Sequence, residues 1–155
     1  MNAAERSQFV YVTYIRTTPQ ALWSALTEPG FMKEYWFGMH CESEFTTGSA
    51  WKLVSEGGEV FDAGEIVQAD PPRLLVIRWE HQKRPELKAE GPSLCTMELV
   101  PFAQAVKLTI THTVERDESK LVDAVSGGWP KILSNLKSLL ETGTVAFDEP
   151  YPSKP

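Results

Sequence analysis

The two ends of the chain constrain its fold most. Near the start, Thr18–Thr27 has the pattern of a short helix, because Thr18 is a good N-cap residue and Pro19 takes the first helical position, where no N–H is needed. Near the end, apolar residues recur at helical spacing over Ser119–Glu141. The stretches between are short, alternating and separated by Gly and Pro, which is typical of strands. This order predicts a curved antiparallel sheet wrapped around one long C-terminal helix, with space for an apolar ligand between them.

Seven stretches have the composition and alternation of strands, and short connections between them favour an antiparallel meander. They are Phe9–Arg16, Cys41–Phe45, Ala50–Val54, Glu59–Gln68, Leu74–His81, Ser93–Val100 and Val106–Val114. A second short helix is expected around Met32 and Trp36, and a loop is expected over 82–92. Pro130 should kink or restart the long helix, because it lacks the N–H that the helix needs. The fold class predicted is α+β.

Composition limits the class of protein. The length of 155 residues fits one domain, which we place at residues 1–142 with an extended or disordered tail at 143–155. The net charge of −6 argues against a nucleic-acid partner. No apolar run is long enough to span a membrane. Cys41 and Cys95 lack CxxC spacing, so we expect reduced thiols in a cytoplasmic protein, with no metal and no cofactor.

Several motifs, in the right order, resemble the activator-of-Hsp90-ATPase-like (AHSA1) family of the START-like, Bet v 1-like (SRPBCC) superfamily. They are Pro19-x-x-x-Trp23-x-Ala25-Leu26-Thr27, Trp36, Gly64-x-Ile66, Pro72-Arg73-Leu74 with Trp79, Glu98-Leu99-x-Pro101, Leu108-x-x-x-His112 and Gly128-Trp129. The resemblance extends over roughly residues 8 to 142. It implies a helix-grip fold, in which the sheet and the long helix enclose a deep apolar cavity.

The same resemblance implies a range of functions rather than one. The superfamily includes lipid and hormone carriers, polyketide cyclases and aromatases, and hydroxylase components with metal centres. Co-chaperones that resemble this family carry a separate N-terminal domain. Here the first strand is expected to start by about residue 8, so Hsp90 activation is not expected. The sequence departs from the family pattern at Pro101–Ala105, where members commonly carry a glycine-rich turn.

Aromatic residues are the leading candidates for a cavity wall, since flat or apolar ligands pack well against them. Trp36 and Trp129 are expected at the pocket, the latter beside the small Gly128, whereas Trp23 and Trp79 suit the core. The full set of residues that we consider for the ligand cavity is Trp36, Trp51, Trp79, His112, Val125, Trp129 and Leu133.

His112 is the candidate for chemistry. An imidazole inside a cavity can move a proton, with Tyr11, Tyr14 or Arg78 as helpers, although a hydrogen-bonded structural histidine is the commoner role. Neighbouring His40 and Cys41 lack further ligands for zinc. Strand register cannot be fixed from the sequence, so which strand residues face the cavity stays open.

Three functions follow from these features. The first is binding of an apolar or aromatic small molecule in a cavity between the sheet and the C-terminal helix. The second is a polyketide cyclase- or dehydratase-like enzyme that uses His112. The third is a protein-interaction or stress-response regulator, and an exposed sheet edge would permit a homodimer.

Overall fold

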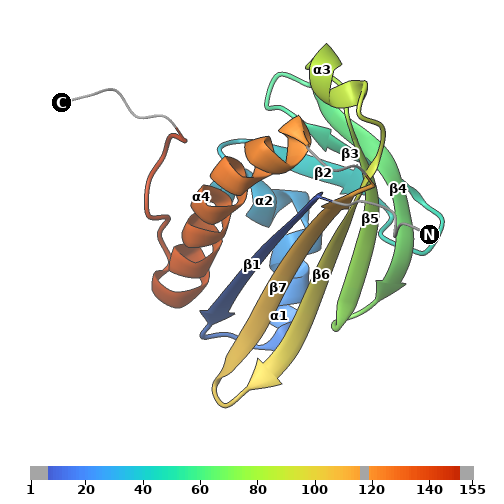
Figure 1. Cartoon of the computed structure of the whole chain (residues 1–155). Coiled ribbons are helices and arrows are strands. Elements are labelled where there is room, and N and C mark those ends of the chain that lie inside the picture. Colours follow the sequence, from blue (N-terminus) through green and yellow to red (C-terminus); the bar gives the residue numbers. More distant parts are fainter. Residues whose placement is uncertain (1–6, 116–118, 151–155) are drawn as a thin grey trace.

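The computed structural model describes residues 7–115 and 119–150, and its framework is one antiparallel sheet. Seven strands pair in the order β1-β7-β6-β5-β4-β3-β2. Figure 1 shows how the sheet curves around the long helix at its concave side. The strands are β1 (Ser7–Ile15), β2 (His40–Ser43), β3 (Ala50–Val54), β4 (Val60–Asp70), β5 (Leu74–His81), β6 (Ser93–Phe102) and β7 (Ala105–Val114).

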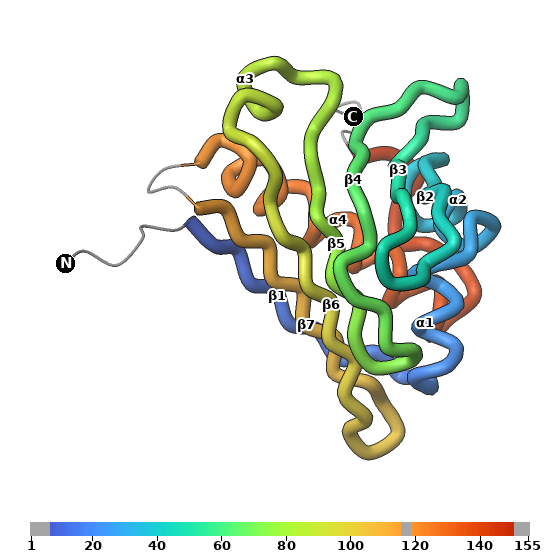
Figure 2. Tube along the Cα trace, turned by 90° about the vertical axis from the view of Figure 1, so that its right-hand side faces the viewer, coloured from blue at the N-terminus to red at the C-terminus, as the bar shows by residue number. Residues whose placement is uncertain are grey.

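Four helices complete the fold over the described residues: α1 (Pro19–Thr27), α2 (Pro29–Tyr35), α3 (Pro85–Lys88) and α4 (Lys120–Thr142). In Figure 2, α2 lies beside β2 at one end of the sheet, and α1 packs against α2. The predicted grip of a curved sheet on a long C-terminal helix is confirmed. In the described part of the chain, no helix has both the length and the apolar character needed to cross a membrane.

Helix starts follow the local sequence. The Thr18 hydroxyl accepts a hydrogen bond from the Ala21 N–H at 3.1 Å, and Ser119 caps α4 in the same way through Val122 at 3.1 Å. α4 continues through Pro130 as one helix, so the helix does not restart there. The expected loop over 82–92 contains the one-turn helix α3, because Leu87 is buried against Val114 and Leu121.

Alternation along the strands places the core on the concave face. In β7 the residues Val106, Leu108 and Ile110 are buried, whereas Lys107 and Thr109 between them are half-buried on the other face. Trp51, Gly64 and Trp79 pair directly across β3, β4 and β5. A Cβ at Gly64 would lie 1.7 Å from the Arg78 carbonyl oxygen, so only glycine fits between the two tryptophans.

The segment after α4 packs back onto the helix. Gly143 ends α4 in the left-handed conformation that favours glycine. The Asn135 side chain, buried on α4, accepts hydrogen bonds from the backbone N–H groups of Ala146 and Phe147, both at 3.0 Å. The Phe147 ring stacks on Phe37 with centroids 5.8 Å apart. Residues 143–147 are therefore tied to the domain.

Candidate functional site

A cavity of about 290 Å³ lies between the β3–β5 part of the sheet and the N-terminal half of α4. Its walls are mostly apolar, with one carboxyl group and one imidazole. The lining residues are Trp36, Met39, Leu53, Phe61, Asp62, Trp79, His81, Leu121, Ala124, Val125, Gly128, Trp129 and Ile132. The rest of the space between sheet and helix is filled by side chains such as Ile110, Leu133 and Leu136. The cavity therefore occupies one end of the grip rather than its whole depth.

Three indoles form the floor of the cavity. The Trp36 and Trp129 rings meet edge to face with centroids 5.3 Å apart, and Trp79 lies 5.9 Å from Trp129 and 6.3 Å from Trp36. Each of the three is at most 6% exposed. They come from the end of α2, from β5 and from α4, so the floor depends on the complete fold. Such a floor suits a flat or apolar ligand.

His112 sits behind this floor and has a complete set of hydrogen bonds. The Trp129 indole donates to Nδ1 at 3.2 Å, and Ser93 Oγ lies 2.7 Å from Nε2. Since Nδ1 accepts, the ring proton of the neutral imidazole is on Nε2, which donates to Ser93 Oγ. The Ser93 hydroxyl then donates to the Trp79 carbonyl oxygen at 3.3 Å. Every polar atom of this network thus has a partner.

The surroundings keep His112 uncharged. The side chain is fully buried, and burial lowers the pKa of His112 to about 4. The neutral form therefore dominates at physiological pH. Of the proposed helpers, Tyr14 and Arg78 are exposed on the outer face, and Arg78 forms an ion pair with Glu65 there. His112 is not among the residues that line the cavity.

Asp62 is the polar group that does line the cavity. It lies on the inner face of β4 and is 6% exposed. Its Oδ1 atom is buried and has no hydrogen-bond partner among the described residues. Burial raises the pKa of Asp62, opposed by the Trp79 indole N–H and then by His81. Asp62 thus places a buried carboxyl with a free oxygen, beside the His81 imidazole, in an otherwise apolar site.

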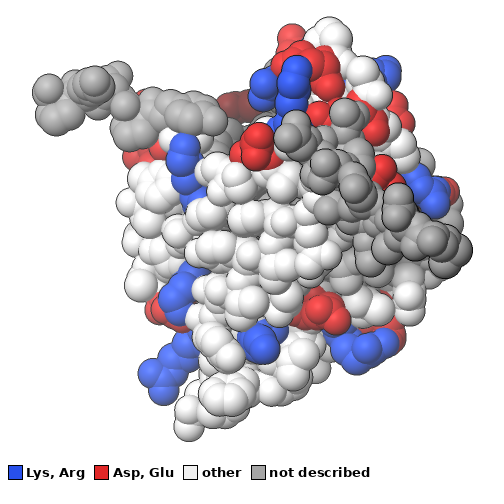
Figure 3. All heavy atoms as spheres, viewed as in Figure 1, with Lys and Arg blue, Asp and Glu red and all other residues white. Residues whose placement is uncertain are grey.

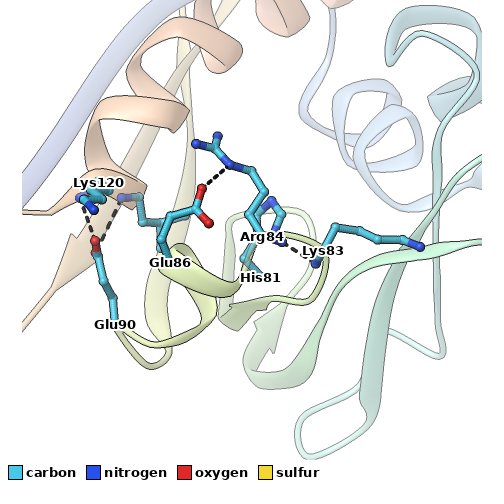
Figure 4. A network of polar contacts seen from close by, with 7 residues as sticks. His81, Lys83, Arg84, Glu86, Glu90 and Lys120 are labelled. Carbon is cyan, nitrogen blue, oxygen red and sulfur yellow. Dashed lines mark hydrogen bonds and ion pairs between the residues drawn. The ribbon is translucent and has the colours of Figure 1, made fainter.

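The rim of the cavity is held by the segment between β5 and β6, which contacts the start of α4. His81 Nδ1 accepts from the backbone N–H groups of Lys83 and Arg84, both at 3.3 Å. At the other end, Glu90 accepts from the Ser119 hydroxyl at 2.6 Å and from the Lys120 N–H at 2.7 Å. Figure 4 shows these contacts around α3 and the start of α4. The carboxylate at the first turn also complements the positive end of the helix dipole.

The seven sequence-predicted cavity residues divide into two groups. Trp36, Trp79, Val125 and Trp129 line the cavity. The others lie behind it: Trp51 packs on Trp79 with centroids 4.4 Å apart, His112 lies in its network, and Leu133 is buried in the core. Sequence reasoning missed Asp62. The signal that could have found Asp62 is alternation along its strand, which places Asp62, Gly64 and Ile66 on one face.

The remaining reactive groups show no assembled site. Cys41 and Cys95 are free and buried, and burial raises the pKa of both thiols, so the unreactive thiol form dominates. The Nε2 atom of His40 lies 3.7 Å from the Oε2 atom of Glu42. Within residues 7–115 and 119–150, no three His, Cys, Asp or Glu side chains gather where they could hold a metal ion.

Known proteins share this architecture. The family model for "Activator of Hsp90 ATPase homolog 1-like protein" matches residues 16–141, whereas no curated protein matches the chain. Protein MLL2253 from Mesorhizobium loti is 23% identical, with a TM-score of 0.74 over 87% of this chain and 97% of that one. The Aha1 dimer from Colwellia psychrerythraea is 16% identical, with a TM-score of 0.72 over 88% of this chain and 98% of that one. DynU16, from the dynemicin biosynthetic locus, is 20% identical, with a TM-score of 0.73 over 91% and 50%.

At these identities the solved structures establish the fold alone. The family match is stronger evidence, because it runs from the end of β1 to the end of α4 and so covers most of the chain. The motifs that suggested the resemblance fall within the same elements. The chain therefore belongs to the AHSA1 family and has the helix-grip fold of the START-like, SRPBCC superfamily.

Proposed function

We propose that this protein binds a small apolar or aromatic molecule in the cavity floored by Trp36, Trp79 and Trp129. The observation that carries the proposal is the cavity itself, about 290 Å³ of aromatic-walled space in an otherwise filled core. Small-molecule sites are concave and mostly apolar, with a few polar groups that set orientation. Ala124 and Gly128 keep the α4 side of the cavity open, because neither has a side chain long enough to fill it.

Two observations favour binding over proton-transfer chemistry at His112. The imidazole lies behind the cavity, and both of its nitrogens are engaged by Ser93 and Trp129. A general base must reach the proton that it abstracts. At His112 that would require Trp129 to leave its hydrogen bond, which opens the floor of the site.

Two adjacent glycines offer a matched test. A Cβ at Gly127 or at Gly128 would meet no atom within 4 Å, and only Gly128 lines the cavity, whereas Gly127 is exposed. Gly128→Leu should therefore fill the cavity, and Gly127→Leu should leave it open. Replacing a glycine inside a helix also raises helix propensity, so both variants are expected to fold.

The measurement is titration with 2-methylnaphthalene, followed by tryptophan fluorescence. Binding is expected in the wild type and in Gly127→Leu, with a loss of at least about tenfold in affinity in Gly128→Leu, since the ligand would have to displace the new side chain. Equal binding in all three proteins would place the ligand elsewhere. Absence of binding in the wild type, together with a native mass spectrum free of any bound small molecule, would contradict the proposal.

A second candidate function is self-association through the outer face of the sheet. Large apolar side chains are exposed there, with Val12 at 45%, Val100 at 51% and Phe102 at 60%. Figure 3 shows a broad area without charged residues over α4, β1 and β7. Large apolar side chains exposed on one face often mark an interface, and the Colwellia relative is described as a dimer.

The mass in solution tests this candidate. Light scattering after size exclusion should give a dimer for the wild type and a monomer for Val12→Lys, because a charge cannot be buried at an apolar interface without a partner. Gln8→Lys, on the same outer face at the start of β1, is the control for added charge. A monomer at all concentrations in the wild type would contradict self-association.

A further inference from the structure

The position of Asp62 makes it the polar centre of the cavity. Its cross-strand neighbours are Leu53 on β3 and His81 on β5, and all three side chains line the same space. Directly paired residues in antiparallel strands share one face of the sheet. Asp62 is 6% exposed, and its Oδ1 atom has no partner among the described residues. The carboxyl group therefore presents an unused acceptor at the cavity wall.

An unpaired acceptor in this position lowers the stability of the ligand-free protein. A buried carboxylate loses its hydration, and the loss is offset only by hydrogen bonds or by an opposite charge. Nearby groups compensate in part, through the Trp79 indole N–H and His81. A ligand that brings a donor to Oδ1 would complete the compensation. The cavity thus favours a ligand group that donates a hydrogen bond, and favours it most when that group is positively charged.

The other walls of the cavity also suit a ligand that carries a positive charge on an apolar body. The described residues that line the cavity include no Lys and no Arg, so an anionic ligand would meet Asp62 without a positive partner from this set. The indoles of Trp36 and Trp79 lie in the same wall, and the faces of tryptophan attract cations. On the opposite side, Ala124, Val125 and Ile132 offer apolar surface for the body of the ligand.

We propose that Asp62 is the anchor for an amine: the ligand is a protonated amine on an aromatic or apolar body, and its N–H group donates to Asp62 Oδ1. This inference rests on the proposed function, because it names the ligand class for the same cavity. It differs in its prediction, since a cavity without a polar anchor would prefer the hydrocarbon to a protonated amine of the same shape, whose charge would be buried without a partner.

The experiment compares four naphthalene ligands of similar shape by calorimetric titration. They are 2-naphthylmethylamine, 2-naphthylmethanol, 2-naphthoic acid and 2-methylnaphthalene. The proteins are the wild type, Asp62→Asn and Glu65→Gln. Asp62→Asn removes the buried charge and keeps the shape, and removing a buried charge should not prevent folding. Glu65→Gln removes a charge from the same strand on the exposed face, where Glu65 pairs with Arg78.

The expected result is that the wild type and Glu65→Gln bind the amine at least about tenfold more tightly than the other three ligands, and that Asp62→Asn loses this preference. If the hydrocarbon binds and the amine is not preferred, or if Asp62→Asn keeps the preference, the amine inference is overturned while cavity binding stands. If the alcohol or the acid binds as tightly as the amine, the inference also fails. If no ligand binds the wild type, the proposed function fails with it.

Discussion

Two buried polar groups, His112 and Asp62, flank Trp79 and differ in one respect. Both point to the concave side of the sheet, and both are nearly or fully shielded from solvent. Each nitrogen of His112 has a hydrogen-bond partner, whereas Asp62 Oδ1 has none among the described residues. The contrast teaches that buried polarity has two uses here. A fully paired group specifies the fold, and an unpaired group beside open space is positioned for a ligand.

The difference follows from what covers each group. His112 is on β7 and is met by Trp129, whose indole N–H reaches Nδ1 from α4. Asp62 is on β4 and faces the first half of α4, where Ala124 and Gly128 line the space. Short side chains cannot reach across to the carboxyl group. The same helix therefore closes one polar site and leaves the other open.

The largest effect on stability is expected when the His112 side chain is removed from its closed site. His112→Ala should lower the free energy of unfolding by about 3–4 kcal/mol, because it leaves a void and removes the partners of the Trp129 indole and the Ser93 hydroxyl. Urea unfolding measures this loss. His112→Gln is the matched control, since an amide can accept from Trp129 and donate to Ser93, and it should retain most of the stability. A His112→Ala protein as stable as the wild type would show that the network does not hold the fold.

The pH dependence of stability should separate the two groups by sign. The pKa of His112 is about 4 in the folded protein, below its ordinary value of 6.5. The unfolded chain therefore binds the proton first, and stability falls as the pH drops from about 6.5 to 4, by about 3 kcal/mol from this residue. Urea midpoints measured across that range should show the fall in the wild type. His112→Gln should flatten it, and an unchanged slope in that variant would contradict a neutral buried imidazole.

Asp62 should show the opposite sign. Burial raises its pKa above the ordinary value, so its ionisation destabilises the folded state as the pH rises through the raised pKa. Asp62→Asn should therefore stabilise the ligand-free protein by about 1 kcal/mol at neutral pH, with the gain shrinking in acid. Thermal melts at pH 4 and pH 7.5 measure this. A variant that is less stable than the wild type at pH 7.5 would mean that the carboxyl group is satisfied after all.

The sequence predicted the fold well because its signals are local. Alternation along each strand and the apolar stripe of α4 need only neighbours at spacings of two, three and four residues. Ser119 and Thr18 mark helix starts by their own hydrogen bonds. The short helix α3 was missed, since its stability comes from Leu87 packing against Val114 and Leu121, which are distant in the sequence.

The site was harder to predict for a related reason. Trp36 and Trp129 could be named as cavity candidates from composition and from the small neighbour Gly128. Asp62 could not, because a shift of one residue in strand register would turn its side chain to the solvent. The cavity volume depends on how the large aromatic side chains pack against one another, and no sequence pattern records that. Which of these residues touch a ligand stays a prediction.

The smallest effect on stability is expected at the start of α4, beside the open cavity, and not at the closed His112 network. Glu90 accepts from the Ser119 hydroxyl and the Lys120 N–H at the start of α4, and Leu121 in the next position lines the cavity. Glu90→Gln removes the charge from these bonds and should cost about 0.5–1 kcal/mol.

Hydrogen exchange distinguishes a local effect from a global one. In Glu90→Gln, amides in the first turns of α4 should exchange faster, whereas those from Trp129 to Leu136, beside the His112 network, should keep their protection. Glu86→Gln is the control, because Glu86 is exposed and forms its ion pair with Arg84. Uniformly faster exchange along α4 would mean that the open and closed sites unfold together. Faster exchange confined to the first turns would mean that the cavity rim can open while the polar network behind Trp129 stays intact.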